Sequence, residues 1–200
     1  DVAVCHNTKP DKPEYLGGKE MTIKAIADRA TGRLLGAQIV GPEGVDKRID
    51  VLATAISYGG KAEDLFYLDL AYAPPFATTK DPVLYTGMIL ENTIHGARPL
   101  MTAQELLDRQ RAGEPTVIID TRAPESYEKS HIEGAISIPL AKLRKSAPSL
   151  DRDAVTVTYC NKGVTGNAAQ NLLLNQGIRH VYNLSGGMNQ YTFVRKMQKR

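Results

Sequence analysis

The hydrophobic pattern of the first half predicts short antiparallel strands and helices. Alternating apolar positions predict three strands, over residues 1–5, 21–28 and 33–41. Apolar residues at helical spacing predict three helices, over residues 45–59, 62–67 and 82–95. Gly32 suits a hairpin loop, Asp81 an N-cap and Pro82 the first turn of a helix. We therefore expect an α+β unit in which an antiparallel sheet packs against helices.

The second half has a different pattern, because its apolar runs are not interrupted by polar residues. These runs predict four strands, over residues 116–120, 136–139, 155–160 and 180–184. Helical segments lie between them, and Thr102 with Glu105 forms a capping box at the start of one helix. Unbroken apolar strands separated by helices indicate an α/β unit, a parallel sheet with helices on both faces. With 96–99 as a linker, we expect two domains, 1–97 and 98–200.

Composition places the chain among ordinary globular proteins. Of 200 residues, 42% are hydrophobic and 24% charged, and the net charge of +3 is too small to imply nucleic-acid binding. Its most basic part, 195–200, is typical of a solvated helix end. No apolar run reaches the roughly 18 residues of a membrane span, and no signal peptide is evident, so we expect a cytoplasmic protein without a membrane partner. The chain begins in a strand pattern without methionine, which favours a fragment of a longer polypeptide.

Two cysteines, Cys5 and Cys160, are too few and too far apart for a disulfide scaffold or a structural zinc site. We expect no metal. Cys5 lies in a predicted strand without a glycine loop nearby and is expected to be structural. His6 and His95 are isolated, and isolated histidines are more often structural or exposed than ligands.

Cys160 stands in the stretch YCNKGVTGN, at the end of a predicted parallel strand and before a predicted helix. Ligands of open α/β sheets bind beyond the carboxyl ends of the strands. Gly163 and Gly166 allow a tight loop whose amides, with the helix N-terminus, point at one spot, and Lys162 adds positive charge. Such a loop stabilises a thiolate and lowers its pKa. The pattern favours a nucleophile, and a buried core cysteine is the alternative.

Three blocks of the second half resemble the rhodanese family, over residues 100–200. They are DTRAPESYEKSHIEGAISIPL (120–140), YCNKGVTGN (159–167) and VYNLSGGM (181–188). The resemblance implies that Cys160 carries a persulfide and that loop amides hold its outer sulfur. The implied cradle comprises Asn161, Lys162, Gly163, Val164, Thr165 and Gly166. Asp120 and Arg122 would brace the site, although a purely structural ion pair is the alternative, and His131 would shape the framework.

The loop departs from many rhodaneses at one position. Thr165 stands near where they carry an arginine, which favours the thiosulfate anion. Threonine suggests another donor, such as a persulfide or a polysulfide. The related arsenate reductases and phosphatases need a CxxxxxR loop, and Asn167 follows Gly166 with no arginine there.

Two segments of the first half, GRLLGAQIVGPEGVDKRIDVLATAI (32–56) and LDLAYAPPFATTKDPVL (68–84), resemble the dimerisation domain of flavin-dependent pyridine nucleotide–disulfide oxidoreductases. They are most similar to the branch containing coenzyme A-disulfide reductases. The loop at Tyr72–Phe76 lacks the His-Pro pair of the glutathione-reductase branch. The resemblance implies a homodimer in which Tyr15 and Tyr72 reach the partner's active cysteine. Aromatic packing is the alternative role for both tyrosines.

Together these resemblances imply the C-terminal part of an FAD- and NAD(P)H-dependent coenzyme A-disulfide, persulfide or polysulfide reductase. No GxGxxG motif follows any predicted strand, so FAD and NAD(P)H, and possibly coenzyme A, belong to the missing flavin and nucleotide domains. The partners are then polysulfide, coenzyme A persulfide or disulfide, those missing domains and a second subunit. Two alternatives remain: a stand-alone sulfurtransferase whose first half only dimerises it, and a non-catalytic sulfide-sensing module.

Overall fold

The computed structural model describes residues 1–198. It divides into two compact units, Asp1–Ala97 and Arg98–Arg200, and each is described by itself. Lys199 and Arg200, the end of the basic tail, lie outside the described residues. No helix in the part of the chain that the structure describes is long and apolar enough to cross a membrane.

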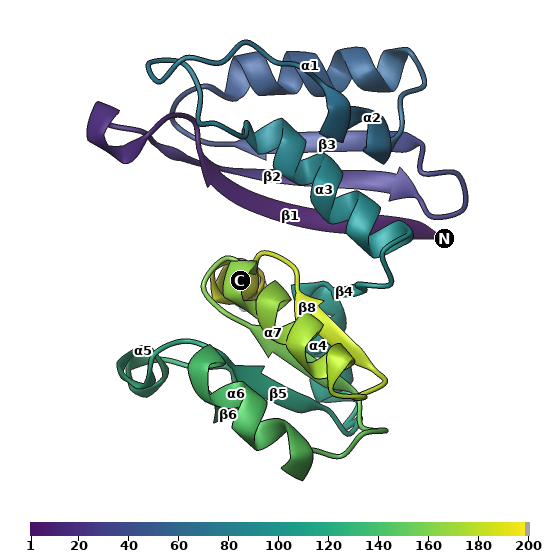
Figure 1. Ribbon diagram of the computed structural model, residues 1–200, viewed down its shortest axis with the longest axis vertical. Coiled ribbons are helices and arrows are strands. Elements are labelled where there is room, and N and C mark those ends of the chain that lie inside the picture. Colours follow the sequence, from purple (N-terminus) through teal and green to yellow (C-terminus); the bar gives the residue numbers. More distant parts are fainter. Residues whose placement is uncertain (199–200) are drawn as a thin grey trace. The chain divides into compact units, whose positions relative to one another are not determined.

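The first unit is built on a three-stranded antiparallel sheet (Figure 1). In spatial order its strands are β1 (Val2–Pro10), β2 (Glu20–Asp28) and β3 (Leu34–Val40). Its helices are the single-turn η1 (Glu14–Leu16), then α1 (Val45–Ser57), α2 (Ala62–Tyr67) and α3 (Pro82–Ile94). The predicted α+β architecture is confirmed. The first strand is longer than predicted, because its polar second half continues to pair with β2 as far as Pro10 opposite Glu20.

Local sequence explains how this unit forms. Every second residue of β2 is buried, from Met21 to Ala27, so one face of the sheet packs against helices while the other is less buried. Gly32 takes a φ of 73° in the hairpin between β2 and β3, a left-handed conformation that favours glycine. Asp81 caps α3, because its side chain accepts a hydrogen bond from the Val83 N–H at 3.0 Å.

Arg48 joins four segments of the first unit. Its side chain is 2% exposed and forms an ion pair with Asp81, Nη2 to Oδ2, at 2.8 Å. It also donates hydrogen bonds to the carbonyl oxygens of Asp11 at 2.8 Å, Gly44 at 3.1 Å and Phe76 at 3.3 Å. The guanidinium therefore bonds to backbone acceptors after β1, before α1 and in the loop before α3.

Replacing Arg48 with methionine is expected to lower the free energy of unfolding of the first unit by about 3–5 kcal/mol, because the buried Asp81 carboxylate loses its partner. Hydrogen exchange of the β1–β3 amides measures this change without assuming that the two units unfold together. Arg33→Met, at an exposed position, is the control and should change the stability by less than about 0.5 kcal/mol. Equal protection in both variants would contradict the assignment.

The second unit is built on a five-stranded sheet in which every neighbouring pair is parallel. In spatial order its strands are β4 (Leu100–Met101), β8 (Val181–Leu184), β7 (Thr156–Tyr159), β5 (Val117–Asp120) and β6 (Ala135–Ser137). Its helices are α4 (Ala103–Arg111), α5 (Pro124–Lys129), α6 (Leu140–Ser146), the single-turn η2 (Ala147–Ser149), α7 (Val164–Asn175) and α8 (Gly187–Met197).

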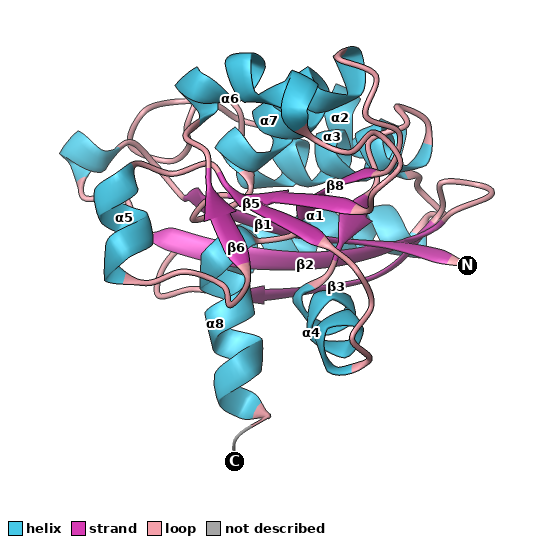
Figure 2. Ribbon diagram, turned by 90° about the horizontal axis from the view of Figure 1, so that it is seen from below, coloured by secondary structure: helices cyan, strands magenta, loops and turns pink. Residues whose placement is uncertain are grey.

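Helices cover both faces of this sheet, as Figure 2 shows for α6 and α7 on one side and α4 and α8 on the other. One core cluster joins Leu106 of α4 and Tyr191 of α8 to the sheet, and a second joins Leu143 of α6 and Leu173 of α7 to the opposite face. The predicted α/β architecture is confirmed. The predicted capping box is also present, since Thr102 and Glu105 exchange side chain–backbone hydrogen bonds at the start of α4.

Candidate functional site

The carboxyl ends of three neighbouring strands meet at one edge of the parallel sheet. Asp120 ends β5, Cys160 directly follows β7, and the turn Ser185–Gly186 follows β8. Side chains and amides from three separated segments therefore gather around the Cys160 thiol. This edge is where α/β folds bind their ligands.

The loop after Cys160 is short and is shaped by Gly163. This glycine has a φ of 96°, and its N–H donates a hydrogen bond to the Cys160 sulfur at 3.2 Å. Helix α7 begins at Val164, directly after Gly163. Because first-turn N–H groups have no partner within their own helix, those of α7 are available to an acceptor in front of it.

Cys160 is a free thiol, 6% exposed, in surroundings that favour its charged form. Burial is the largest single influence and raises the pKa of Cys160. Hydrogen bonds from the Thr165 side chain and from the backbone of Gly166, Lys162 and Gly163 together outweigh burial, so the pKa of Cys160 is lowered. Lys162 lowers the pKa of Cys160 through its backbone N–H. A lowered pKa increases the fraction of thiolate, which is the nucleophilic form of cysteine.

Thr165→Val is expected to raise the pKa of Cys160, because the hydrogen bond from the Thr165 side chain lowers that pKa more than any of the backbone hydrogen bonds does. Only the thiolate reacts with iodoacetamide, so the rate rises as the pH passes through the pKa. The valine variant should therefore reach its plateau at a higher pH than wild type. Thr192→Val, on α8, removes a hydroxyl that does not contact the sulfur and serves as the control. Identical pH profiles for Thr165→Val and wild type would contradict the assignment.

The loop pattern predicted that Gly166 helps to turn the chain. In the structure Gly166 instead allows close packing. It lies in the first turn of α7, where an added Cβ would be 2.4 Å from the Asn183 Oδ1 and 3.2 Å from the Tyr159 Cα. The Asn183 side chain, 6% exposed, in turn donates a hydrogen bond to the Gly163 carbonyl oxygen at 3.0 Å. Sequence reasoning did not single out Asn183, although a lone asparagine inside the apolar strand VYNL was the available signal.

Gly187 lets α8 begin directly against the Cys160 backbone. It has a φ of 59°, and an added Cβ would lie 2.3 Å from the Cys160 carbonyl oxygen. The N–H groups of Met188 and Asn189 donate hydrogen bonds to the carbonyl oxygens of Cys160 and Asn161, at 2.8 and 3.1 Å. Helix α8 therefore fixes the backbone from which the thiol projects.

Asp120 and Arg122 form a buried ion pair beside the loop. Nη2 of Arg122 lies 2.6 Å from Oδ2 of Asp120, whose side chain is fully buried. The pair raises the pKa of Arg122, first through the hydrogen bond to Asp120. Arg122 also donates to the Asn161 Oδ1 at 3.2 Å and to the Ser130 carbonyl oxygen at 2.6 Å. The guanidinium therefore links the strand end to the residue that follows Cys160.

His131 lies outside this group of contacts. Its ring stacks on the ring of Tyr127, with centroids 4.0 Å apart, and its Nδ1 lies 2.9 Å from the Tyr127 carbonyl oxygen. The Tyr127 hydroxyl donates to the Ala135 carbonyl oxygen at 2.7 Å. These contacts join the end of α5 to the start of β6.

The other residues with possible chemistry lie in the first unit. Cys5 is fully buried, and burial raises its pKa to about 12, so its thiol stays neutral. Burial and then the charge of Lys24 lower the pKa of His6 to about 4. Tyr15 and Tyr72 are exposed, by 78% and 57%, and lie in η1 and in the loop after α2, respectively.

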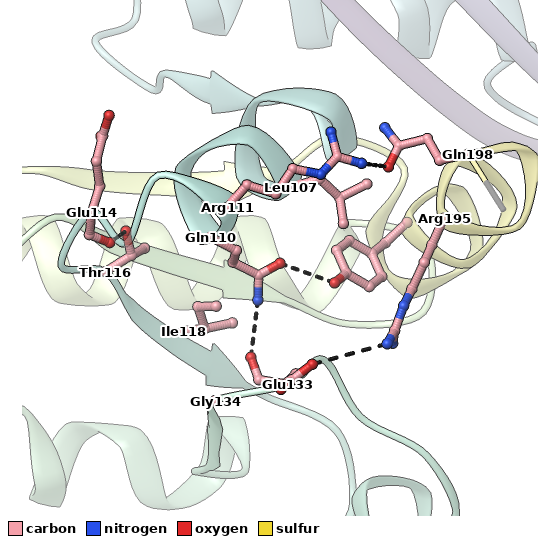
Figure 3. A pocket seen from close by; sticks show the side chains of 11 residues that line it. Leu107, Gln110, Arg111, Glu114, Thr116, Ile118, Glu133, Gly134, Arg195 and Gln198 are labelled. Carbon is pink, nitrogen blue, oxygen red and sulfur yellow. Dashed lines mark hydrogen bonds and ion pairs between the residues drawn. The ribbon is translucent and has the colours of Figure 1, made fainter.

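A pocket of about 550 Å³ opens at the opposite edge of the parallel sheet, between α4 and α8 (Figure 3). Its polar side chains bond to one another. Gln110 accepts from the Tyr191 hydroxyl at 3.0 Å and donates to the Glu133 carbonyl oxygen at 3.0 Å, while Arg111 donates to Gln198. Among the described residues that line this pocket there is no cysteine.

The second unit thus defines a class of protein: an α/β domain that holds a thiol of lowered pKa among backbone amides. Family models match both units. Residues 102–193 match the rhodanese-like domain, and residues 1–82 match the dimerisation domain of pyridine nucleotide-disulphide oxidoreductases. The chain belongs, through its second unit, to the rhodanese family, and its first unit is a dimerisation domain of the oxidoreductase type.

Relatives with established names agree with both assignments. The chain is 36% identical over 70 residues to the thiosulfate sulfurtransferase PspE of Escherichia coli, covering 34% of this chain and 67% of PspE. It is 39% identical over 92 residues to the NAD(P)H coenzyme A polysulfide/persulfide reductase of Pyrococcus horikoshii, covering 46% of this chain and 20% of that enzyme. The chain spans about a fifth of the length of the sulfur reductases it matches.

Solved structures match both units together. The structure of reduced CoADR-RHD from Bacillus anthracis superposes with a TM-score of 0.91 at 32% identity, over 98% of this chain and 35% of that one. The predicted pairing of a dimerisation domain with a rhodanese domain is therefore confirmed.

Proposed function

We propose that this chain provides the dimerisation and sulfur-transfer parts of an FAD- and NAD(P)H-dependent reductase of coenzyme A disulfide, persulfides or polysulfides. One observation carries the proposal: the Cys160 sulfur accepts the Gly163 N–H at the mouth of α7 and has a lowered pKa. The similarity to CoADR-RHD and to a polysulfide/persulfide reductase supports the reductase context.

The chemistry assigned to Cys160 is redox-neutral transfer of one sulfur atom. The Cys160 thiolate attacks the outer sulfur of a persulfide R–S–SH. The donor S–S bond breaks, R–S⁻ leaves with the bond's electron pair, and Cys160 becomes a persulfide. An acceptor thiolate then attacks the outer sulfur, which restores the Cys160 thiolate and produces the acceptor persulfide.

The loop holds the outer sulfur in this scheme. A persulfide is acidic, and its charge is placed where backbone N–H groups converge at a helix N-terminus. Asp120 and Arg122 act indirectly, because Arg122 positions Asn161 and thereby the start of the loop. The assigned cradle consists of Asn161, Lys162, Gly163, Val164, Thr165 and Gly166.

The first unit is assigned a homodimer contact. Large apolar side chains are exposed on it, among them Val40 at 77%, Tyr67 at 77% and Phe76 at 70%, and such side chains mark interaction surfaces when they gather. Tyr15 and Tyr72 are assigned to the partner's flavin site. A phenol there donates a hydrogen bond to a thiolate.

FAD and NAD(P)H are assigned to regions of the relatives that this chain does not span. When bound there, they supply the electrons that reduce a disulfide or persulfide. The part of this chain is to accept sulfur on Cys160, hold it and pass it to a thiol.

The proposal is tested in the polypeptide that contains this chain, by following NADH oxidation with coenzyme A persulfide and with polysulfide. Cys160→Ser should slow the polysulfide reaction in which sulfur must first be captured, while direct reduction of coenzyme A disulfide continues. Equal rates for wild type and Cys160→Ser with every substrate would contradict a sulfur-transfer role for the second unit.

Thr165→Arg is expected to raise the rate with thiosulfate by about tenfold or more, because a charge-assisted hydrogen bond to the anion is gained. Thr165→Gln, a neutral side chain of comparable reach, is the control and should bring no such gain. The measurement is the rate at which Cys160 takes up sulfur from thiosulfate. No difference between the arginine and glutamine variants would contradict the charge argument.

A further inference from the structure

A second pocket, of about 490 Å³, adjoins the Cys160 loop on the side of α5 and α8. It differs from the cradle, because the loop residues from Lys162 to Gly166 do not line it. Its walls are mostly side chains with hydroxyl, amide or cationic groups. They include Arg122, Ser126, Lys129, Ser130, Asn161 and Asn189.

The pocket shares a wall with the backbone that carries the nucleophile. Asn161 follows Cys160 directly and lines the pocket. Asn189 and Arg122 also line it. The Asn189 N–H donates a hydrogen bond to the Asn161 carbonyl oxygen at 3.1 Å, and Arg122 donates one to the Asn161 Oδ1 at 3.2 Å. A substrate whose sulfur meets Cys160 can therefore place its remaining atoms in this pocket.

The charge of the pocket comes from Lys129. Arg122 is neutralised by the buried Asp120 carboxylate. Lys129 is exposed and forms no ion pair with the residues that the structure describes. None of the described residues that line the pocket carries a carboxylate, although Glu125 and Glu128 lie on the same helix.

The spacing of residues along α5 explains which of its side chains line the pocket. Ser126, Lys129 and Ser130 stand at positions i, i+3 and i+4 and therefore share one side of α5 and its end. Glu128 precedes Lys129 by one residue and lies about 100° away around the helix, whereas Glu125, one turn before Lys129, lies nearer to it but does not line the pocket. The pocket is thus a cationic surface with hydroxyl and amide donors rather than an apolar slot.

We propose that this pocket binds the organic part of the thiol or persulfide substrate, and that Lys129 selects substrates carrying a carboxylate or phosphate there. The inference rests on the proposed sulfur transfer and names its substrate class: small thiols with an anionic group, as R–S–SH donors or R–S⁻ acceptors. In this proposal Lys129 recognises the negative charge on the R group of the substrate, beside the cradle. This recognition replaces the arginine that many rhodaneses carry near the position of Thr165.

The test compares the rates of Cys160 persulfide formation from three donors, measured by trapping and intact mass. Two donors are anionic, glutathione persulfide with carboxylates and coenzyme A persulfide with phosphates, and 2-hydroxyethyl persulfide is neutral. Lys129→Met should lower kcat/KM for anionic donors about three- to fivefold and leave the neutral donor unchanged. Lys129→Glu should lower it further, and about 0.5 M salt should remove the wild-type preference.

Lys142→Met, which removes an exposed lysine from α6, is the matched control and should change no donor. An effect on only one anionic donor identifies carboxylate or phosphate as the recognised group. Equal effects of Lys129→Met on all three donors, or none on any, would overturn the pocket assignment while sulfur loading of wild type still upholds the proposed function. A wild type that loads from no donor would instead refute the proposed function.

Discussion

Cys160→Ser is expected to lower the rate of sulfur transfer by at least about 10³-fold, because a serine hydroxyl is neither ionised at neutral pH nor able to hold a transferable sulfur. The amides that stabilise the thiolate remain in place, so the loss reports the nucleophile itself. The assay follows sulfur passing from a persulfide donor to an acceptor thiol.

Cys5→Ala is the matched control, because it removes the only other cysteine. Cys5 is fully buried, and burial raises its pKa to about 12. Its replacement should leave the transfer rate within about twofold, even if the small cavity lowers stability somewhat. A Cys160→Ser protein that still transfers sulfur while Cys5→Ala does not would move the reaction to the first unit and contradict the account.

Gly187→Ala is expected to reduce sulfur loading of Cys160 by about 10²-fold, because misplacing reacting groups by about 1 Å has effects of that order. The new methyl group would lie 2.3 Å from the Cys160 carbonyl oxygen and 2.8 Å from the carbonyl carbon of Asn161. These are backbone atoms, so α8 must move away. The hydrogen bonds from Met188 and Asn189 to that backbone are then lost.

Gly113→Ala is the control for backbone strain. Gly113 has a φ of 68°, comparable to the 59° of Gly187, but its added Cβ would meet no atom within 4 Å. It shares the strain of a left-handed conformation, about 1–2 kcal/mol, without the clash. Sulfur loading should therefore persist in Gly113→Ala. Circular dichroism shows whether each variant is folded, and a folded Gly187→Ala protein with the wild-type rate would contradict the role of α8.

The sequence predicted the site best where local pattern determines it. An apolar strand, a cysteine and a glycine-spaced loop before a helix are all contiguous, so the position of Cys160 at the sheet edge followed from the residues from Val155 to Asn175. Sequence comparison singled out Thr165 because it stands where many rhodaneses carry an arginine. Its hydrogen bond to the Cys160 sulfur was not predicted, since that bond depends on α7 beginning at Val164. Helix starts are difficult to place from sequence within a few residues.

Contacts between distant segments were not predictable in the same way. Asn183 and Gly187 meet the Cys160 loop only because β8 pairs with β7. Similarly, Ser130, which follows α5, accepts a hydrogen bond from Arg122 through its carbonyl oxygen. The polar second half of β1 is another case, since strand pairing with β2 and not side-chain pattern keeps it extended. Such features depend on tertiary pairing, which single-sequence periodicity does not contain.

The most direct measurement is the intact mass of this chain after incubation with polysulfide, followed by peptide mapping. The account predicts a gain of one sulfur atom, located on the peptide that contains Cys160, removed by a thiol acceptor and absent from Cys160→Ser. A chain that never gains sulfur, or gains it only on Cys5, would contradict the account.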